Sequence, residues 1–552
     1  MQHEHSPTPA IHNPVLPGSH PDPSILRVGD DFYLATSTFE WCPGVRLHHS
    51  RDLVNWSTLG GALDETRLLD LTGCPDSGGV WAPNLSYADG QFYLVHSNVS
   101  TYAGGFTDCV NYVVTAPTID GPWSDPVLLH ARGFDASLFH DGDESWLLNL
   151  AHDWRPGHGG SAGLEATLFD RKTQRLLGAP ERIVLPEQAG WIEGPNLFRI
   201  GDWYYLLTAD GGTGYDHQVT VARSSALHGP YERNPHGPLL TARDHPDLPL
   251  QKAGHGSLVQ AGSGQQTSSD EWYLAYLVAR PHSRRGPCIL GRETALAPVE
   301  WTADGWPSVP TALPALTVPA PSLSKNNHPA PAPALQSLAS PQDGFDEPIL
   351  GPQWSTLRRH ASAEWMSLTE RESHLRLRGG RSPRSLLGAS LVARRADAPR
   401  CRFEATLDYH PQDPRHLAGI TAYYNTENWY FLHVTIDDDQ RPVLRVASSN
   451  RGRTTVDEPG QRVLDKPDLR RLKLGLALAN GTLTFRYDSG DGWHPVGPTL
   501  DATVLSDEHA EVFDDGQIRT LGFTGTFLGL WAWDLSGGAH PADFDDAIYE
   551  RV

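Results

Sequence analysis

A short pattern of polar and apolar positions recurs five times in the first 300 residues. In each copy a turn of glycine or acidic residues precedes aromatic residues and leucine: GDDFYL (29–34), ADGQFYL (88–94), DGDESWLLNL (141–150), GDWYYLL (201–207) and SDEWYLAYL (269–277). A second short apolar segment precedes each copy: HPDPSILRV (20–28), VWAPNLSYA (80–88), GFDASLFHD (133–141), WIEGPNLFRI (191–200) and AGHGSLVQA (253–261). Two such segments joined by a Gly/Asp turn are typical of a β-hairpin. Five hairpin-led repeats with almost no helical periodicity predict a five-bladed β-propeller.

The pattern changes after Trp306. Residues 311–342 are rich in Pro, Ala and Ser and are interpreted as an extended linker lying over a surface. Strand-like runs resume beyond it and are typical of a β-sandwich. The predicted fold is therefore all-β: a propeller catalytic domain over 1–310, the linker, and a jelly-roll-like β-sandwich over 343–552 that contributes to the active-site wall.

Composition narrows the function classes. With 552 residues the chain is long enough for two or three domains. Its net charge of -22 and its lack of a basic run disfavour nucleic-acid binding. The five cysteines are odd in number and contain no CxxC pair, which disfavours a disulfide framework or a zinc site. No apolar run approaches the roughly 18 residues of a membrane span. The first twenty residues contain no signal-peptide pattern, so we expect a cytoplasmic protein, with a trimmed leader as the alternative.

Three acidic residues occupy similar places in the repeat. Asp22 lies 11 residues before Tyr33, Asp135 lies 11 before Trp146, and Glu193 lies 11 before Tyr204. The second repeat has Ala82 next to Trp81 there, and the fifth has His255 nearby. Because the innermost strand of each blade lines the central channel, these positions are predicted to face one pocket. The alternative is that each acid only caps a turn.

A set of three carboxylates suits glycosidic bond cleavage. That reaction needs one protonated acid for the leaving oxygen and one carboxylate that activates water or attacks carbon. A third carboxylate can raise the pKa of the acid by like-charge repulsion. Phe39, Trp81 and Phe134 are candidates for stacking on a sugar ring.

Several motifs in order support a family resemblance. HPDPS, WAPNL, GFDASLF, IEGPNLF, GHGSLV and LGRETAL resemble glycoside hydrolase family 43, the β-xylosidase and α-L-arabinofuranosidase group, and especially its two-domain β-xylosidases. The resemblance continues through NTENWYFLHVT and FTGTFLGLWAWDLSGGAHPADFD and so covers nearly the whole chain. The main departures are the long linker and a polar insertion at 261–270.

The resemblance implies an inverting mechanism. Asp22 matches the general base, Glu193 the general acid, and Asp135 the residue that modulates the pKa of the acid and orients it. Inversion requires base and acid carboxyl groups about 6.5–9.5 Å apart. Arg292 matches an arginine that contacts the bound sugar, and Thr213 and His217 are placed near the pocket by the same analogy.

The resemblance also suggests roles for His255 and for two phenylalanines. A histidine like His255 lies below the substrate in similar proteins, near water or a metal, so a Ca²⁺ in the propeller channel is one interpretation. A hydrogen-bonded channel histidine is the other, and no cofactor is expected to be required. Phe523 and Phe527, four residues apart and assigned to one strand face, are candidates for an aromatic wall from the second domain. Alternatively, both belong to the sandwich core.

The predicted function is an exo-acting, inverting hydrolase that releases xylose from the non-reducing end of β-1,4-xylo-oligosaccharides. An α-L-arabinofuranosidase, or an enzyme with both activities, is the nearest alternative, because the two sugars differ little in a pocket. A non-catalytic sugar-binding propeller and a retaining hydrolase of the fructosidase type are the others. Neither nucleic acid nor membrane is an expected partner, and homo-oligomerisation is left open.

Overall fold

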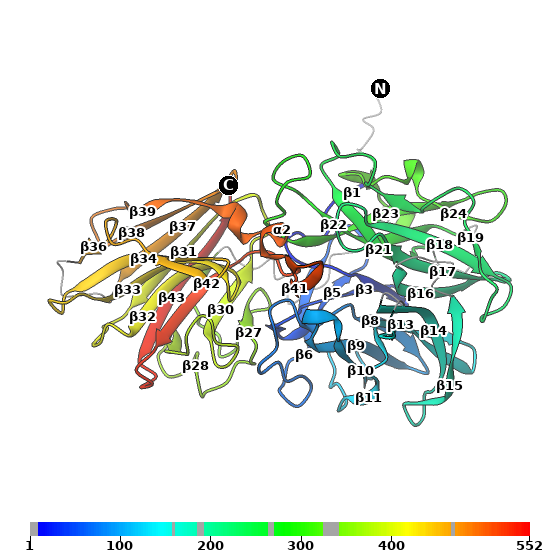
Figure 1. Cartoon of the computed structure of the whole chain (residues 1–552), viewed down its shortest axis with the longest axis horizontal. Helices are drawn as coiled ribbons and strands as arrows, with labels where there is room; N and C mark the ends of the chain where they lie inside the picture. Colours follow the sequence, from blue (N-terminus) through cyan, green and yellow to red (C-terminus); the bar gives the residue numbers. More distant parts are fainter. Residues whose placement is uncertain (1–8, 157–159, 185–191, 263–269, 324–341, 465–469) are drawn as a thin grey trace, which may run out of the picture.

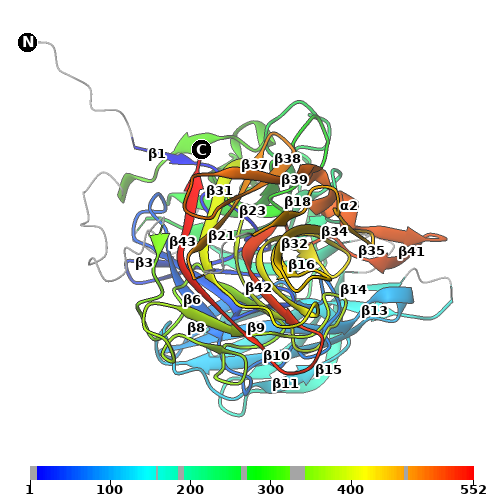
Figure 2. The ribbon, with the colours of Figure 1, turned by 90° about the vertical axis from the view of Figure 1, so that its left-hand side faces the viewer.

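The computed structural model describes residues 9–156, 160–184, 192–262, 270–323, 342–464 and 470–552. It consists of two β domains side by side (Figure 1): the strands up to β25 (Thr317–Pro319), apart from β4 (Trp41–Cys42), form the N-terminal domain, and those from β26 (Gln342–Asp343) onward belong to the C-terminal domain. Figure 2 looks from the C-terminal domain toward the N-terminal one, which lies behind it. Within the described residues no helix is long and apolar enough to cross a membrane.

The N-terminal domain has five antiparallel blades, and each predicted hairpin forms an antiparallel strand pair of one blade. The first blade contains β2 (Ser24–Val28), β3 (Asp31–Thr36), β5 (Gly44–Ser50) and β6 (Ser57–Leu63). The second contains β7 (Gly79–Val80), β8 (Asn84–Ala88), β9 (Gln91–Thr101), β10 (Asp108–Ala116) and β11 (Val127–His130). The third contains β12 (Gly133–Asp141), β13 (Glu144–Asp153), β14 (Gly160–Asp170) and β15 (Arg175–Val184). The fourth contains β16 (Ile192–Ile200), β17 (Trp203–Asp210), β18 (Gln218–Ser224), β19 (Glu232–Arg233) and β20 (Leu240–Thr241). The fifth contains β21 (Gln251–Gln260), β22 (Trp272–Ala279), β23 (Arg292–Trp301) and β24 (Pro307–Ser308). The predicted five-bladed propeller is confirmed.

Polar side chains join the inner strands around the channel. The Ser24 hydroxyl accepts a hydrogen bond from the Leu85 amide of the next blade at 2.9 Å, and the Asn84 side chain accepts one from Leu138 at 2.9 Å. The inner strands contact one another in a closed ring, in which β21 contacts β2. Because buried polar groups need partners, these bonds hold neighbouring blades in register.

The ends of the propeller chain meet on the fifth blade. Asn13 donates to Leu296 O at 2.8 Å and accepts from Leu296 N at 2.9 Å. Beside it, β1 (Ala10–His12) pairs with β25 (Thr317–Pro319), after the short helix η2 (Pro310–Ala312). The start of the segment predicted as a linker therefore lies against the propeller, and its remainder, 324–341, is outside the described residues.

The C-terminal domain is a β-sandwich, as predicted. One sheet contains β26 (Gln342–Asp343), β28 (Met366–Ser367), β29 (Leu375–Arg378), β31 (Arg400–Asp408), β37 (Leu472–Ala479), β38 (Thr482–Asp488), β39 (His494–Asp501) and β43 (Pro541–Arg551). The other contains β27 (Ser355–Leu357), β30 (Ser390–Arg395), β32 (His416–Asn425), β33 (Asn428–Ile436), β34 (Pro442–Asn450), β35 (Arg453–Val456), β36 (Arg462–Val463), β42 (Phe527–Asp534) and one propeller strand, β4 (Trp41–Cys42). A large apolar core lies between the sheets.

The two domains are firmly joined. Strand β4 extends a sandwich sheet by pairing with β27. The buried Asp76 of the propeller accepts hydrogen bonds from Arg358 at 2.6 Å and from Thr426 at 2.5 Å. Removing one partner of a buried charge pair is strongly destabilising, so this contact fixes how the sandwich sits on the propeller.

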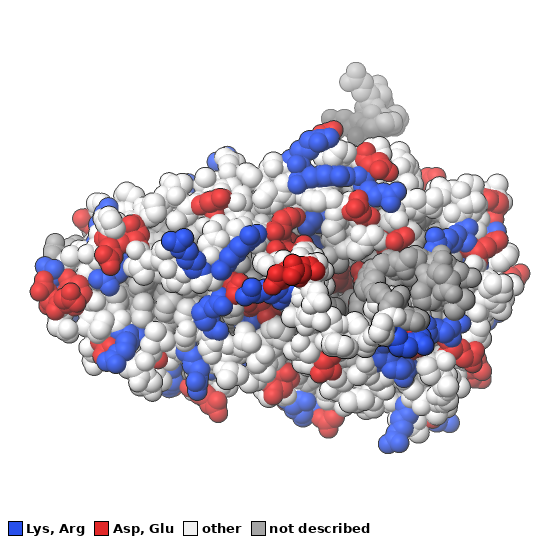
Figure 3. All heavy atoms as spheres, in the orientation of Figure 1, with Lys and Arg blue, Asp and Glu red and all other residues white. Residues whose placement is uncertain are grey.

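Basic and acidic side chains are interspersed on the face of the molecule that Figure 3 shows.

A small helical and hairpin segment of the second domain lies between the domains (Figure 1). It comprises η4 (Ala502–Leu505), α2 (Asp507–Ala510), β40 (Val512–Asp514) and β41 (Gln517–Thr520). The short helix η1 (Ala103–Gly105) belongs to the propeller and contacts β41.

Candidate active site

Four blades place a residue with left-handed backbone at the same point of the inner strand. The φ angles are 57° at Asp22, 53° at Asp135, 58° at Gly194 and 46° at His255. Asp22, Asp135 and Gly194 each precede by two residues the position where the hairpin ladder becomes regular, and His255 precedes it by one. Non-glycine residues rarely adopt this conformation, and they persist in it where the surroundings hold them, often at functional sites.

The predicted alignment of Glu193 with the two aspartates is off by one residue. Glu193 pairs with Ala209 just as Phe134 pairs with Leu150, and a bulge follows each of them. The backbone equivalent of Asp135 is therefore Gly194. The alignment relied on an equal spacing of 11 residues from each acid to an aromatic residue. That spacing gives the wrong register, because Tyr204 and Trp146 are not at equivalent ladder positions.

Replacing Gly194 by Ala should destabilise the fold beyond the usual cost of a left-handed alanine, about 1–2 kcal/mol. A Cβ atom there would lie 2.9 Å from Cε1 of His255, so the imidazole or the bulge must move. Overpacking of this kind costs a further 1–3 kcal/mol, roughly. Gly90→Ala is the matched control, since φ there is also positive, at +77°, but nothing lies within 4 Å. Equal losses of unfolding free energy in urea would contradict the prediction.

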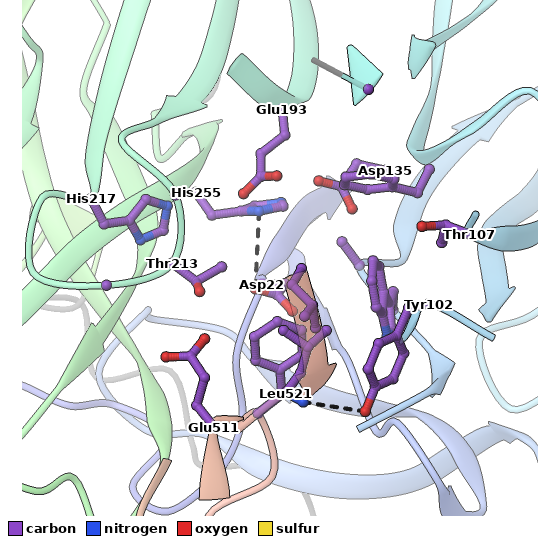
Figure 4. A pocket seen from close by; sticks show the side chains of 18 of the residues that line it. Asp22, Tyr102, Thr107, Asp135, Glu193, Thr213, His217, His255, Glu511 and Leu521 are labelled. Carbon is purple, nitrogen blue, oxygen red and sulfur yellow. Dashed lines mark hydrogen bonds and ion pairs between the residues drawn. The ribbon is translucent and has the colours of Figure 1, made fainter. Parts of the chain in front are cut away.

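The channel mouth opens into a cavity of about 560 Å³ that contains all three predicted carboxylates. In Figure 4 the side chains of Asp22, Asp135 and Glu193 point into it from different blades. The other predicted residues that line it are Phe39, Trp81, Phe134, Thr213, His217, His255, Arg292 and Phe523. The propeller thus brings together residues up to 270 positions apart along the chain.

Asp22 lies among donors and a cation. The Ser37 hydroxyl donates to its Oδ2 at 2.6 Å. Nη1 of Arg292 lies 3.7 Å from Oδ1, and Nδ1 of His255 lies 4.0 Å from it. Ser37 and Arg292 therefore hold the Asp22 carboxyl group in place at the cavity.

Asp135 is in the opposite situation. Burial, followed by the negative charges of Glu193 and Asp22, raises its pKa well above the ordinary value. The Gly194 amide donates to its Oδ2 at 3.1 Å and offsets part of this effect. Because the charge of Glu193 is one cause of this shift, the Asp135 carboxyl titrates as part of an interacting group and retains its proton to higher pH than an isolated aspartate.

The two histidines of the pocket favour their neutral forms. Burial lowers the pKa of His255, with the Asp22 charge opposing it. Burial also lowers the pKa of His217 to about 3, and Nδ1 of His217 lies 3.1 Å from Lys252 O. Ca²⁺ takes 6–8 oxygen ligands, roughly. The described residues contain no group of three His, Cys, Asp or Glu side chains placed to hold a metal.

The second domain supplies more of the pocket than was predicted. Six residues around hairpin β40–β41 line it besides Phe523: Glu511, Phe513, Gly516, Gln517, Ile518 and Leu521. The Tyr102 hydroxyl accepts a hydrogen bond from Leu521 N at 3.2 Å (Figure 4), and Ser77 donates to Leu521 O at 2.9 Å. The letters DDG at 514–516 are a turn signal, but nothing local indicates where the hairpin docks.

Of the two predicted wall residues, Phe523 reaches the pocket and Phe527 does not. The Phe523 ring lies 5.6 Å from the Phe39 ring, and the Arg292 guanidinium lies 4.4 Å from its centroid. Phe527 stacks on Trp41 at 3.8 Å within the sandwich. The assignment of Phe527 to the pocket is wrong, because β42 begins at Phe527 and Phe523 precedes the strand.

Comparisons with known proteins agree with this architecture. The family model "Glycosyl hydrolases family 43" matches residues 11–307, and "Beta xylosidase C-terminal Concanavalin A-like domain" matches 342–550. A β-xylosidase of Bacillus subtilis is 40% identical, over 97% of this chain and 98% of its own. Xylosidase/arabinosidase 43B of Humicola insolens is 39% identical, over 99% and 98%. The crystal structure of xylan β-1,4-xylosidase from Bacillus halodurans superposes with a TM-score of 0.90 at 44% identity, covering 98% of this chain and all of that one.

Proposed function

This chain belongs to glycoside hydrolase family 43, and we propose that it is an exo-acting, inverting β-xylosidase that releases xylose from the non-reducing end of β-1,4-xylo-oligosaccharides. One observation carries the proposal: three buried carboxylates face a pocket that the second domain walls on one side. A one-sided wall suits a chain end better than the middle of a polymer.

In the proposed reaction Asp22 takes a proton from a water molecule as the water oxygen attacks the anomeric carbon. The bond from that carbon to the glycosidic oxygen breaks, and Glu193 gives its proton to the departing oxygen. The new hydroxyl lies on the face opposite to the leaving group, so a β-xyloside yields α-xylose. Asp135 keeps a proton available to Glu193 through like-charge repulsion and burial. Arg292 and the aromatic wall position the sugar, and no cofactor takes part.

Two assays test the function. Hydrolysis of an aryl β-xyloside should exceed that of an aryl α-L-arabinofuranoside in kcat/KM, and proton NMR should show α-xylose as the first-formed anomer. Dominant turnover of the arabinoside would establish the alternative that the Humicola relative's name supports. If β-xylose formed first, inversion would be wrong.

We propose a cytoplasmic location, because a pocket for chain ends suits short oligosaccharides taken up by the cell. Enzyme activity in the soluble cytoplasmic fraction would support this location, and activity confined to the medium or the cell surface would contradict it.

Asp135→Asn should lower activity and raise stability at the same time. When the pKa of an acid is higher in the folded protein than in the unfolded protein, the free energy of unfolding falls as the pH rises. The fall begins near the unfolded pKa, about 3.8, and ends above the folded pKa. The neutral amide removes this penalty of up to about 1.4 kcal/mol per pH unit crossed. We therefore expect a higher Tm than wild type that diverges from it between pH 4 and 8, and a lower kcat. An equal or lower Tm at pH 8 would contradict the burial argument, and Asp30→Asn, at an exposed position, serves as control.

Phe523→Ala should reduce kcat/KM for xylobiose by about tenfold, which corresponds to losing an aromatic contact and a cation–π contact of roughly 1.5 kcal/mol together. Phe527→Ala is the matched comparison. It should cost about 3–5 kcal/mol of stability, as buried Phe→Ala changes do, and leave kcat/KM of the folded enzyme unchanged. Steady-state kinetics and thermal unfolding separate the two effects, and a loss of kcat/KM in the folded F527A enzyme would contradict the assignment.

A further inference from the structure

A second cleft between the domains is unusually rich in arginine. It has a volume of about 610 Å³ and shares no lining residue with the active-site pocket. His20, Arg46 and His48 enter it from the propeller, and Arg394 and Arg395 enter it from β30 of the sandwich.

Arg46 and Arg395 are both buried and share a hydrogen-bond partner. Both contact the Ser355 hydroxyl, Arg46 through Nη2 at 2.8 Å and Arg395 through Nη1 at 3.4 Å. Their other hydrogen bonds go to backbone carbonyls: Arg46 Nη1 donates to Pro352 O at 2.6 Å, and Arg395 Nε donates to Ser19 O at 2.5 Å. The Arg395 guanidinium also lies 5.1 Å from the centroid of the Phe527 ring. Their exposed fractions are 1% and 8%.

Neither of these guanidinium groups has a counter-ion in the part of the chain that the structure describes. Arg46, Arg394 and Arg395 form no ion pair with any carboxylate there. Four buried nitrogens around the cleft also have no hydrogen-bond partner among the described residues: Arg46 Nε, Arg394 Nε, His20 Nδ1 and His48 Nε2. A buried charge without a partner is costly, so a ligand that supplied negative charge here would be favoured.

Among the described residues, the acids that line the cleft form no ion pair with Arg46, Arg394 or Arg395, although the charge of Asp397 opposes the lowering of the Arg394 pKa by burial. Asp397 is held by the fork of Arg551, with Nη2 at 2.8 Å, and by the Tyr549 hydroxyl at 2.6 Å. Glu550, near the end of β43, is exposed. Burial, followed by the positive charges of Arg46 and Arg395, lowers the pKa of His48 to about 3.

We propose that this cleft binds a phosphate-class oxyanion, free or carried on a small molecule, between the propeller and the sandwich. Guanidinium forks match the geometry of phosphate oxygens, and unpartnered imidazole nitrogens can donate or accept at the same group. The volume falls in the usual small-molecule range of about 300–1,000 Å³, which leaves room for an organic part beside the anion.

Calorimetric titration of the full-length protein tests the proposal. Inorganic phosphate and ribose 5-phosphate are the probes, at an ionic strength held constant with chloride. We expect one saturable site per chain. Tighter binding of the sugar phosphate would identify a carried phosphate group, and equal binding a free anion. The absence of saturable binding with both probes would overturn the proposal.

Variants locate the site. Arg394→Gln and Arg395→Gln should each weaken binding by at least about tenfold, the loss expected for one charge-assisted hydrogen bond. Arg359→Gln is the control, since that arginine also donates to a carbonyl, Ala389 O, and to a serine hydroxyl, but outside the cleft. Unchanged affinity in both cleft variants would place the anion elsewhere and reject the site.

Crystals of the wild-type protein soaked in tungstate provide a measurement that does not depend on variants folding. An anomalous peak between Arg46, Arg394 and Arg395 would support the site. A soak without a peak there would overturn the proposal and leave Arg46 and Arg395 with the single role of binding carbonyls across the domain interface.

Discussion

Asp22→Asn should reduce kcat for xylobiose by about 10²–10⁴-fold, the usual contribution of a general base, with little change in KM. The amide is nearly isosteric and its oxygen can still accept the hydrogen bond from Ser37. It cannot take a proton from water, so binding survives while the attack on carbon slows. Steady-state kinetics on xylobiose and on 4-nitrophenyl β-xyloside measure the loss.

Both substrates should lose activity to a similar extent in this variant, because water must be activated whatever the leaving group is. Asp30→Asn is the control: Asp30 lies on the turn of the same hairpin, with a side chain 89% exposed, and should keep wild-type kinetics. A kcat within about tenfold of wild type would remove Asp22 from the role of base.

Much of this fold could be predicted because the propeller is a local repeat. Each hairpin carries its own signal, as in GDDFYL, where Val28 pairs with Asp31 across a glycine turn. The convergence of Asp22, Asp135 and the fourth blade then follows from radial symmetry. The same reasoning placed Glu193 one position out of register, since a bulge changes the ladder without changing the spacing of apolar residues.

The contacts between domains could not be predicted in this way. Asp76 meets Thr426 across 350 positions, and Ser77 meets Leu521 across 444. No periodic pattern encodes which loops meet when two domains dock. The wall of the pocket was therefore predicted only as a choice between two phenylalanines, and the hairpin at 512–520 was missed.

The cleft arginines were missed for a related reason. Arg394 and Arg395 read along the chain as polar residues near a strand end. Only the folded structure shows that Arg46 from the propeller, and no carboxylate of the described residues, lies close enough to Arg395 to act on its charge. A net charge of -22 for the whole chain says nothing about a local group of unpaired positive side chains.

Glu193→Gln should reduce kcat for xylobiose by about 10²–10⁴-fold but should affect 4-nitrophenyl β-xyloside far less. A xylose oxygen leaves poorly without a proton, whereas 4-nitrophenolate leaves unaided. In the wild type, kcat for xylobiose should fall as pH rises through the raised pKa of the carboxyl pair, because the acid loses its proton. That limb should disappear from the profile of the variant.

The dependence on leaving group is what distinguishes Glu193 from Asp22, because removal of a base slows both substrates and removal of an acid slows mainly the poor leaving group. Glu300→Gln, at an exposed position on β23, should keep both activities and controls for the substitution itself. Equal losses on xylobiose and the aryl xyloside would show that Glu193 positions the sugar instead of protonating the leaving oxygen. In that case Asp135, which shares the proton of the pair, would be the acid to test next by the same two substrates.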